Sequence, residues 1–299
     1  MKLLRNHPLV TFFALAYLLP WAIWGTTIVQ QHGKLTFHLP ASLAFWVGLQ
    51  MAIYLSAALT GGRAAVKDVL TRIFGFRISP RWYAVTAVVA LAQAAVPLAL
   101  FVALGGHHAG EIGRLAPAHS LPAFLLVEFL LFLFTEEAAW RGFALPRLQT
   151  IFTPAKASLI LGLLWSLWHI PLFLTAGTFQ ADIPYAGFVL ATVSTSVIIS
   201  WLFNNSGGSV VLPALYHAVV DCAIVYLGVM TASRTLFWLN VAAQVALALF
   251  LLLTARVPNV MLQAERLRFP TPELAQEAPQ STPPVRVKPS FDQAPQGRE

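Results

Sequence analysis

Charged residues are scarce in this sequence: Asp, Glu, Lys and Arg make up 10% of its 299 residues, whereas 58% are hydrophobic. A water-soluble domain usually has about 25% charged and about 45–50% apolar residues. Cysteine is nearly absent too, because Cys222 is the only one, which excludes an intramolecular disulfide and a cysteine-based metal cluster. The composition therefore excludes a soluble globular protein, a nucleic-acid-binding protein and a disordered chain. It indicates a polytopic membrane protein.

Several runs free of Asp, Glu, Lys and Arg exceed the roughly 20 residues that a helix needs to cross a bilayer. A turn-like Asn-Asn-Ser-Gly-Gly segment at 204–208 divides the longest of them. We therefore predict an all-α fold, a polytopic membrane bundle of about eight transmembrane helices. The predicted helices span roughly 8–30, 39–60, 82–104, 121–145, 157–175, 185–203, 209–229 and 235–255.

The distribution of basic residues predicts the orientation of the bundle. With eight spans, 16 of the 19 Lys and Arg residues fall on the side that holds the N-terminus, and this side should be cytoplasmic. Both termini are then cytoplasmic, in a multi-pass protein of the cell membrane. Residues 1–256 form the predicted bundle, and the Pro-rich segment 257–299 is expected to be a disordered cytoplasmic tail.

Ionisable groups inside a membrane span are costly, and by default they mark a functional site. The first such group is Glu136-Glu137 followed by Arg141. Glu137 and Arg141 are four residues apart, so they share a helix face and can pair. Glu136 projects about 100° away from Glu137, which leaves its carboxylate available as a general base. A salt-bridge cluster at a helix end is the structural alternative.

Two further motifs follow in later predicted spans. Trp165 and His169 are four residues apart and share a face, and so are His217 and Asp221. Each has a structural interpretation, either as a hydrogen-bond partner between helices or as a paired strut. By helical rise, the polar groups of all three motifs lie roughly 12–20 Å from the cytoplasmic ends of their helices. We therefore expect them to face one buried cavity.

The pattern Glu-Glu-x-x-x-Arg, then aromatic-x-x-x-His, then His-x-x-x-Asn/Asp resembles the CAAX protease and bacteriocin-processing (CPBP) family. This is the type II CAAX prenyl endopeptidase-like group of intramembrane proteases, and the likeness covers residues 121–229. It implies that Glu136 is the general base, which activates the attacking water together with His169. It also implies that His217 and Asp221 stabilise the oxyanion.

The same resemblance implies that Glu137 and Arg141 are a supporting pair, with Trp165 as a supporting aromatic residue. One position departs from the pattern, because the prenyl endopeptidases typically carry Asn where this chain has Asp221. An ionised carboxylate cannot donate to an oxyanion, so Asp221 must be protonated, orient His217 or bind a metal. The departure weakens the case for a strictly prenylated substrate.

The expected function is hydrolysis of a peptide bond in a membrane-associated peptide or protein, without a cofactor. Two alternatives stay open. His169, His217 and a carboxylate could instead bind a catalytic zinc ion. A non-catalytic scaffold, or a transporter with an acidic proton relay, would use the same residues without hydrolysis. The expected partners are the substrate and the lipid bilayer, with no nucleic acid.

Overall fold

The computed structural model describes residues 6–107 and 117–254, and every regular element within these residues is helical. The all-α prediction is therefore confirmed for the described part of the chain. The tail predicted at 257–299 lies outside the described residues.

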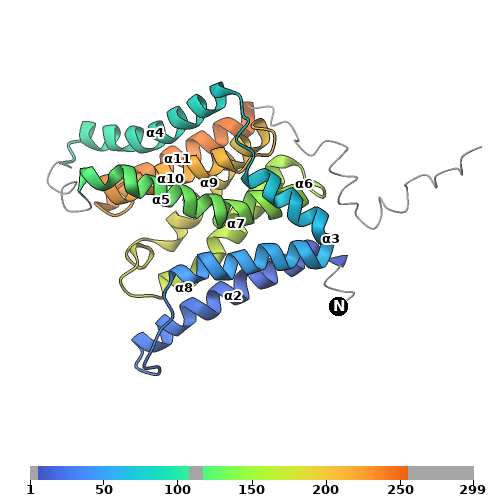
Figure 1. Ribbon diagram of the computed structural model, residues 1–299. Coiled ribbons are helices and arrows are strands. Elements are labelled where there is room, and N and C mark those ends of the chain that lie inside the picture. Colours follow the sequence, from blue (N-terminus) through green and yellow to red (C-terminus); the bar gives the residue numbers. More distant parts are fainter. Residues whose placement is uncertain (1–5, 108–116, 255–299) are drawn as a thin grey trace, which may run out of the picture.

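The helices follow the predicted order. Figure 1 shows α2 (Pro8–Gln31), η1 (Ala44–Leu49) with α3 (Gln50–Ile73), α4 (Pro80–Ala103), η3 (Ala118–Ser120) with α5 (Leu121–Phe134), η4 (Ala138–Ala144) with α6 (Leu145–Gln149), α7 (Pro154–Trp168), α8 (Ile170–Phe173), η5 (Phe179–Asp182), α9 (Tyr185–Asn205), α10 (Val211–Leu227) and α11 (Arg234–Thr254). Several begin at Pro, whose missing N–H costs nothing in the first helical turn. The α10 helix ends at Gly228, which adopts a left-handed conformation with φ of 58°.

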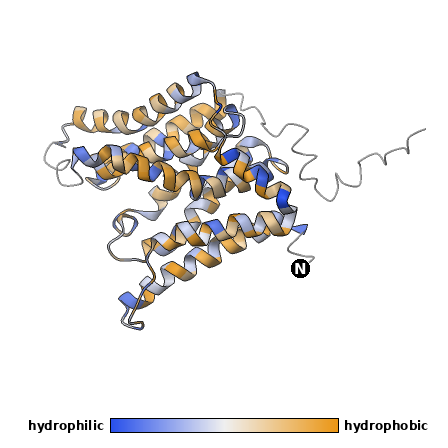
Figure 2. Cartoon of the chain, viewed as in Figure 1, coloured by the Kyte–Doolittle hydropathy of each residue, from blue (hydrophilic) through white to orange (hydrophobic). Residues whose placement is uncertain are grey.

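Six helical segments are long and apolar enough to cross a membrane: 8–31, 44–73, 80–103, 118–149, 185–205 and 234–254. The predicted fifth and seventh spans correspond to α7 and α10, which are shorter, with 15 and 17 residues. Large apolar side chains are exposed along the outer helices, such as Leu18 on α2, Val88 on α4 and Val127 on α5. Figure 2 shows hydrophobic residues along most of the helical length. The fold is a helical membrane bundle whose apolar surface suits a lipid environment.

The second predicted helix, 39–60, ends next to a break inside α3, because Gly62 has non-helical φ and ψ of 61° and −150°, and a second helical stretch follows it to Ile73. The uncharged run stops at Arg63, which set the predicted boundary. An amphipathic stripe continues beyond it, with Ala65, Val69 and Ile73 buried at intervals of four residues. Burial of this stripe stabilises the second helical stretch, which the prediction did not include.

Two predicted helices are interrupted beside the candidate residues. The helix predicted at 121–145 breaks at Thr135, whose φ and ψ are −114° and −91°, and continues as the π-helical segment η4. The helix predicted at 157–175 ends at Trp168, because Pro171 cannot donate the next backbone hydrogen bond. Each break lies next to one of the polar motifs, Glu136-Glu137 in the first case and His169 in the second. The first break leads into a π-helical turn, and such turns are frequent at functional sites.

The helix contacts place α9 among the central elements. It packs against α7, α10 and α11, while α10 also contacts α4 and α5. In Figure 1, α2 and α3 run side by side on the opposite side of α7 from α4. The motifs lie on η4 and just before it, on α7 and on α10. Both α7 and α10 pack against α9, and α7 also contacts η4.

Candidate active site

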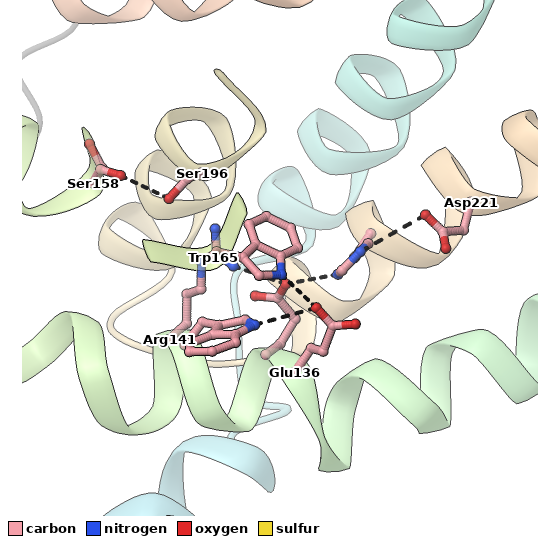
Figure 3. Close-up of polar contacts among 9 residues, drawn as sticks. Glu136, Arg141, Ser158, Trp165, Ser196 and Asp221 are labelled. Carbon is pink, nitrogen blue, oxygen red and sulfur yellow. Dashed lines mark hydrogen bonds and ion pairs between the residues drawn. The ribbon is translucent and has the colours of Figure 1, made fainter. Parts of the chain in front are cut away.

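Glu136 lies immediately after the break between α5 and η4, and its side chain is buried. Its Oε2 atom accepts a hydrogen bond of 2.6 Å from the indole Nε1 of Trp165 and a longer one of 3.3 Å from Trp140. Figure 3 shows Trp165 and Glu136 pointing toward each other from different helices. Within the described residues, Oε1 of Glu136 makes no hydrogen bond. One oxygen is thus held in place and the other is available to a reactant.

Glu137 points to a different set of partners. Its Oε1 atom accepts from the Arg141 guanidinium at 3.1 Å and from Nδ1 of His217 at 2.9 Å. Glu137 and Arg141 are fully buried, and the guanidinium lies 4.8 Å from the ring centre of Trp165. The predicted pairing of Glu137 with Arg141 is confirmed, and the same carboxylate also anchors α10 through His217.

His169 forms the C-terminal cap of α7. Its Nδ1 atom lies 2.9 Å from the backbone carbonyl oxygen of Trp165. A carbonyl oxygen only accepts, so this contact requires a proton on Nδ1 and leaves Nε2 of the neutral ring as the acceptor. The ring is also in edge contact with Trp168 and Phe188, which fixes its orientation.

His217 is held more tightly by Glu137 than by Asp221. The distance from its Nε2 atom to Oδ1 of Asp221 is 3.9 Å, which is too long for a hydrogen bond. The ring stacks on Phe132, with centroids 3.6 Å apart and planes 6° from parallel. His217 and Asp221 do share a face, as predicted, but the aspartate side chain is the more exposed, at 32%. Nε2 of His217 is therefore directed to open space beside Asp221.

All four predicted catalytic residues line one cavity of about 290 Å³. Glu136, His169, His217 and Asp221 reach it from three separate helical regions, and Trp165 lines it as well. The expected convergence of the three motifs in one cavity is therefore observed. Glu137 and Arg141 are not part of the cavity lining, but Glu137 bonds to His217, which is. This cavity can hold a short stretch of substrate, with a carboxylate, two imidazoles and a second carboxylate around it.

Sequence reasoning missed several contributors to the site. Trp140 donates to Glu136, Phe132 stacks on His217, and Glu137 bonds to His217. The spacing of Glu136 and Trp140 could have suggested the first contact, since side chains four residues apart lie on one helix face. The other two join different helices, and local spacing carries no signal for them. Glu128, which was not assigned a catalytic role, also lines the cavity.

The same side chains are the candidates for the metal site of the zinc alternative. Among residues 6–107 and 117–254, no three His, Cys, Asp or Glu side chains form a group that could hold a metal ion. Nδ1 of each histidine has a partner, the Trp165 carbonyl for His169 and Glu137 for His217, but metal-bound histidines also have such partners, so these bonds do not count against a metal. Because the described residues contain no such group of three, His169, His217 and a carboxylate would have to move before they could bind one zinc ion.

Comparison with known proteins gives two matches to the same region. Residues 118–223 match the family model of the type II CAAX prenyl endopeptidase Rce1-like proteins. A 106-residue segment is 33% identical to a protein of Methanococcus maripaludis named CAAX prenyl protease 2. That segment is 33% of this chain and spans 39% of the relative's length. The family resemblance that the three motifs carry is therefore confirmed for residues 118–223, the part of the chain that holds the candidate active site.

Proposed function

We propose that this protein is an intramembrane endopeptidase that hydrolyses a peptide bond of a membrane-associated peptide or protein. One observation carries the proposal: Glu136, His169, His217 and Asp221 line a single cavity inside a membrane bundle. The name of the Methanococcus relative, a CAAX prenyl protease, supports the same reaction class.

In the proposed reaction, Oε1 of Glu136 removes a proton from a water molecule, and the water oxygen attacks the scissile carbonyl carbon. The carbonyl π electrons move to oxygen and form a tetrahedral oxyanion. Nε2 of His217, when protonated, donates to that oxyanion while Nδ1 donates to Glu137. Glu136 then passes that proton to Nε2 of His169, which gives it to the leaving nitrogen; the oxyanion pair re-forms the carbonyl, and the C–N pair leaves with the amine. Every proton and electron pair is then accounted for by side chains that line or support the cavity.

The proposal requires no metal ion. Asp221, whose Oδ1 lies 3.9 Å from Nε2 of His217, attracts the protonated ring by charge in the proposed mechanism, while Glu137 and Phe132 hold the ring in place. The zinc alternative and the scaffold alternative make different predictions. A zinc enzyme loses activity with a strong chelator and regains it with zinc, whereas a scaffold binds its partner without cleaving it.

The test uses the full chain reconstituted in liposomes with an internally quenched peptide that ends in a farnesylated CAAX sequence. An unprenylated copy fused to an apolar membrane anchor serves as the second substrate. Glu136→Gln should lower the cleavage rate by at least about 100-fold, because the amide cannot act as a base. The amide oxygen still accepts from Trp165 and Trp140, so the temperature of unfolding should stay unchanged.

Wild-type rates for Glu136→Gln would refute the proposal. Cleavage of both probes would assign the enzyme to membrane peptides generally, and cleavage of the farnesylated probe alone would assign it to prenylated proteins. Activity that survives a chelator supports metal independence. Loss of partner binding in Glu136→Gln, with no cleavage by the wild type, would favour the scaffold.

We also propose that the bundle sits in the cell membrane with both termini in the cytoplasm, as the charge distribution predicts. Lys34 and Lys67 are exposed and fall on opposite sides in this arrangement. Single cysteines at these positions, in a chain with Cys222→Ala, should be labelled by a membrane-impermeant thiol reagent from outside and inside respectively. The reverse pattern would overturn the orientation.

A further inference from the structure

The cavity has a second wall that the catalytic proposal does not use. Four uncharged hydrogen-bonding side chains form this neutral wall: Gln180 on η5, Thr192 and Thr195 on α9, and Gln244 on α11. All four are more than nine-tenths buried. They come from different elements than the catalytic residues, so they form a separate surface of the same cavity.

Most of the hydrogen-bonding capacity of the neutral wall is unused. The hydroxyl of Thr195 donates to Oε1 of Gln244 at 3.3 Å. This bond fixes the orientation of the Gln244 amide and leaves both hydrogens on its Nε2 atom free. Within the described residues, the side chains of Gln180 and Thr192 make no hydrogen bond. Polar groups buried inside a membrane bundle cost free energy unless a partner satisfies them. The free polar atoms of this wall are open to the cavity, so water or a substrate inside it can bond to them.

The chemistry of intramembrane cleavage requires such a wall. A peptide bond in a helix has its N–H and C=O groups bonded within the helix, and attack on its carbonyl requires the segment to unwind. Each backbone group released in the bilayer costs several kcal/mol unless it finds another partner. Thr192 and Thr195 lie one helical turn apart, about 5–6 Å, which is close to the repeat of two residues in an extended strand, about 6.6 Å.

We propose that the neutral wall is a subsite for the unwound backbone of the substrate, in which the Gln244 amide donates to a substrate carbonyl. Thr192 and Gln180 complete the wall and hold the neighbouring backbone groups of an extended segment. The inference rests on the proposed peptidase function, and it adds three substrate-positioning residues. Gln244 lies beyond the segment 118–223 that matches the family model, whereas Gln180 and Thr192 lie within it.

The experiment compares three variants with the wild type in the liposome assay, using whichever quenched peptide the wild type cleaves. Gln244→Met and Thr192→Val keep the shape of the side chain and remove its hydrogen-bonding atoms. Each should raise KM about 3- to 10-fold and leave kcat within about two-fold, as expected for a lost binding contact. Asn240→Leu is the matched control, because Asn240 is buried one turn away on α11 but bonds to Gln93 and does not line the cavity.

A second measurement separates substrate binding from general packing. In the inactive Glu136→Gln background, the Kd of the peptide is measured by fluorescence anisotropy while one backbone carbonyl at a time is replaced by a thioamide. A thioamide at one carbonyl should weaken binding of the peptide to the Glu136→Gln protein. The same thioamide should have no effect on binding to the protein that also carries Gln244→Met. Coupling at no position would overturn the subsite, and so would an unchanged KM in both wall variants.

The two proposals fail in different ways. Wild-type KM in the wall variants, with Glu136→Gln inactive, refutes the subsite and leaves the peptidase function intact. Activity in Glu136→Gln refutes the peptidase mechanism, and the anisotropy series still decides whether the neutral wall binds a peptide. A rise in KM for Asn240→Leu equal to that for Gln244→Met would assign the effect to packing of α11 and refute the subsite.

Discussion

Trp165→Phe tests whether Glu136 depends on the indole that holds it. The Nε1–H of Trp165 donates to Oε2 of Glu136 at 2.6 Å, the shorter of the two indole contacts. A hydrogen bond to a charged group contributes about 1.5–3 kcal/mol. If that energy serves to orient the carboxylate, its loss lowers kcat by about 10- to 100-fold. Phenylalanine keeps an aromatic ring over Arg141 and beside His217, so those contacts are largely preserved.

The matched control is Trp168→Phe on the same helix. Nε1 of Trp168 donates to the backbone oxygen of Ala16 at 2.8 Å, and the residue is fully buried. This variant removes an equivalent hydrogen bond away from the carboxylate, and phenylalanine keeps an aromatic ring beside His169, so it should lower the unfolding temperature while the folded enzyme keeps its kcat. Both variants are assayed in liposomes with the same quenched peptide, and their unfolding is followed in detergent.

Two results would refute this reasoning. Trp165→Phe with wild-type kcat would mean that Trp140 alone orients Glu136, or that orientation does not limit the rate. An equal loss of kcat in the two tryptophan variants would mean that the effect comes from packing of α7. A loss in Trp165→Phe that appears in KM and spares kcat would assign the indole to substrate binding.

Three further changes separate stability from catalysis. Glu137→Gln leaves the buried Arg141 without its carboxylate and should lower the free energy of unfolding by about 3–5 kcal/mol, measured by chemical denaturation in detergent. Gly162→Ala should cost about 1–3 kcal/mol, because its Cβ would lie 2.7 Å from a backbone atom of α9, whereas Gly25→Ala meets nothing within 4 Å and should leave stability unchanged or higher. Asp221→Asn should keep most of the cleavage rate, because Glu137 and Phe132 still hold the His217 ring; abolished cleavage would show that the carboxylate itself is required.

Most of the fold could be predicted from hydropathy, because the runs that set the helices are long and free of charge. The errors occur where a different force decides the boundary. The buried stripe of Ala65 and Val69 adds a second helical stretch to α3 after the break at Gly62, past the charged residue that ends the apolar run. At Thr135 the apolar run gives way to Glu136 and Glu137, and Pro171 follows His169 by two residues, but each predicted helix continues through these signals. Tertiary contacts around the site stabilise the interrupted backbone there.

The candidate site could be predicted as a set of residues but not as a network. Intervals of four residues identify pairs such as Glu137 with Arg141, since both members lie on one helix. The bond from His217 to Glu137 joins positions 80 residues apart, and no local pattern encodes it. The neutral wall was missed for the same reason, because Gln180 and Gln244 are ordinary polar residues until the fold brings them to one cavity.

Two adjacent glutamates take different roles here because of their surroundings. The break at Thr135 and the π-helical turn after it direct Glu136 to the indole of Trp165 at the cavity wall, while Glu137 faces the buried guanidinium and His217. A carboxylate enclosed by charged partners contributes to stability, and one with a free oxygen on a cavity can act on a substrate. The two Glu→Gln variants should therefore differ: the first loses cleavage and keeps its unfolding temperature, and the second loses stability. Equal losses of stability in both would mean that this division of roles is wrong.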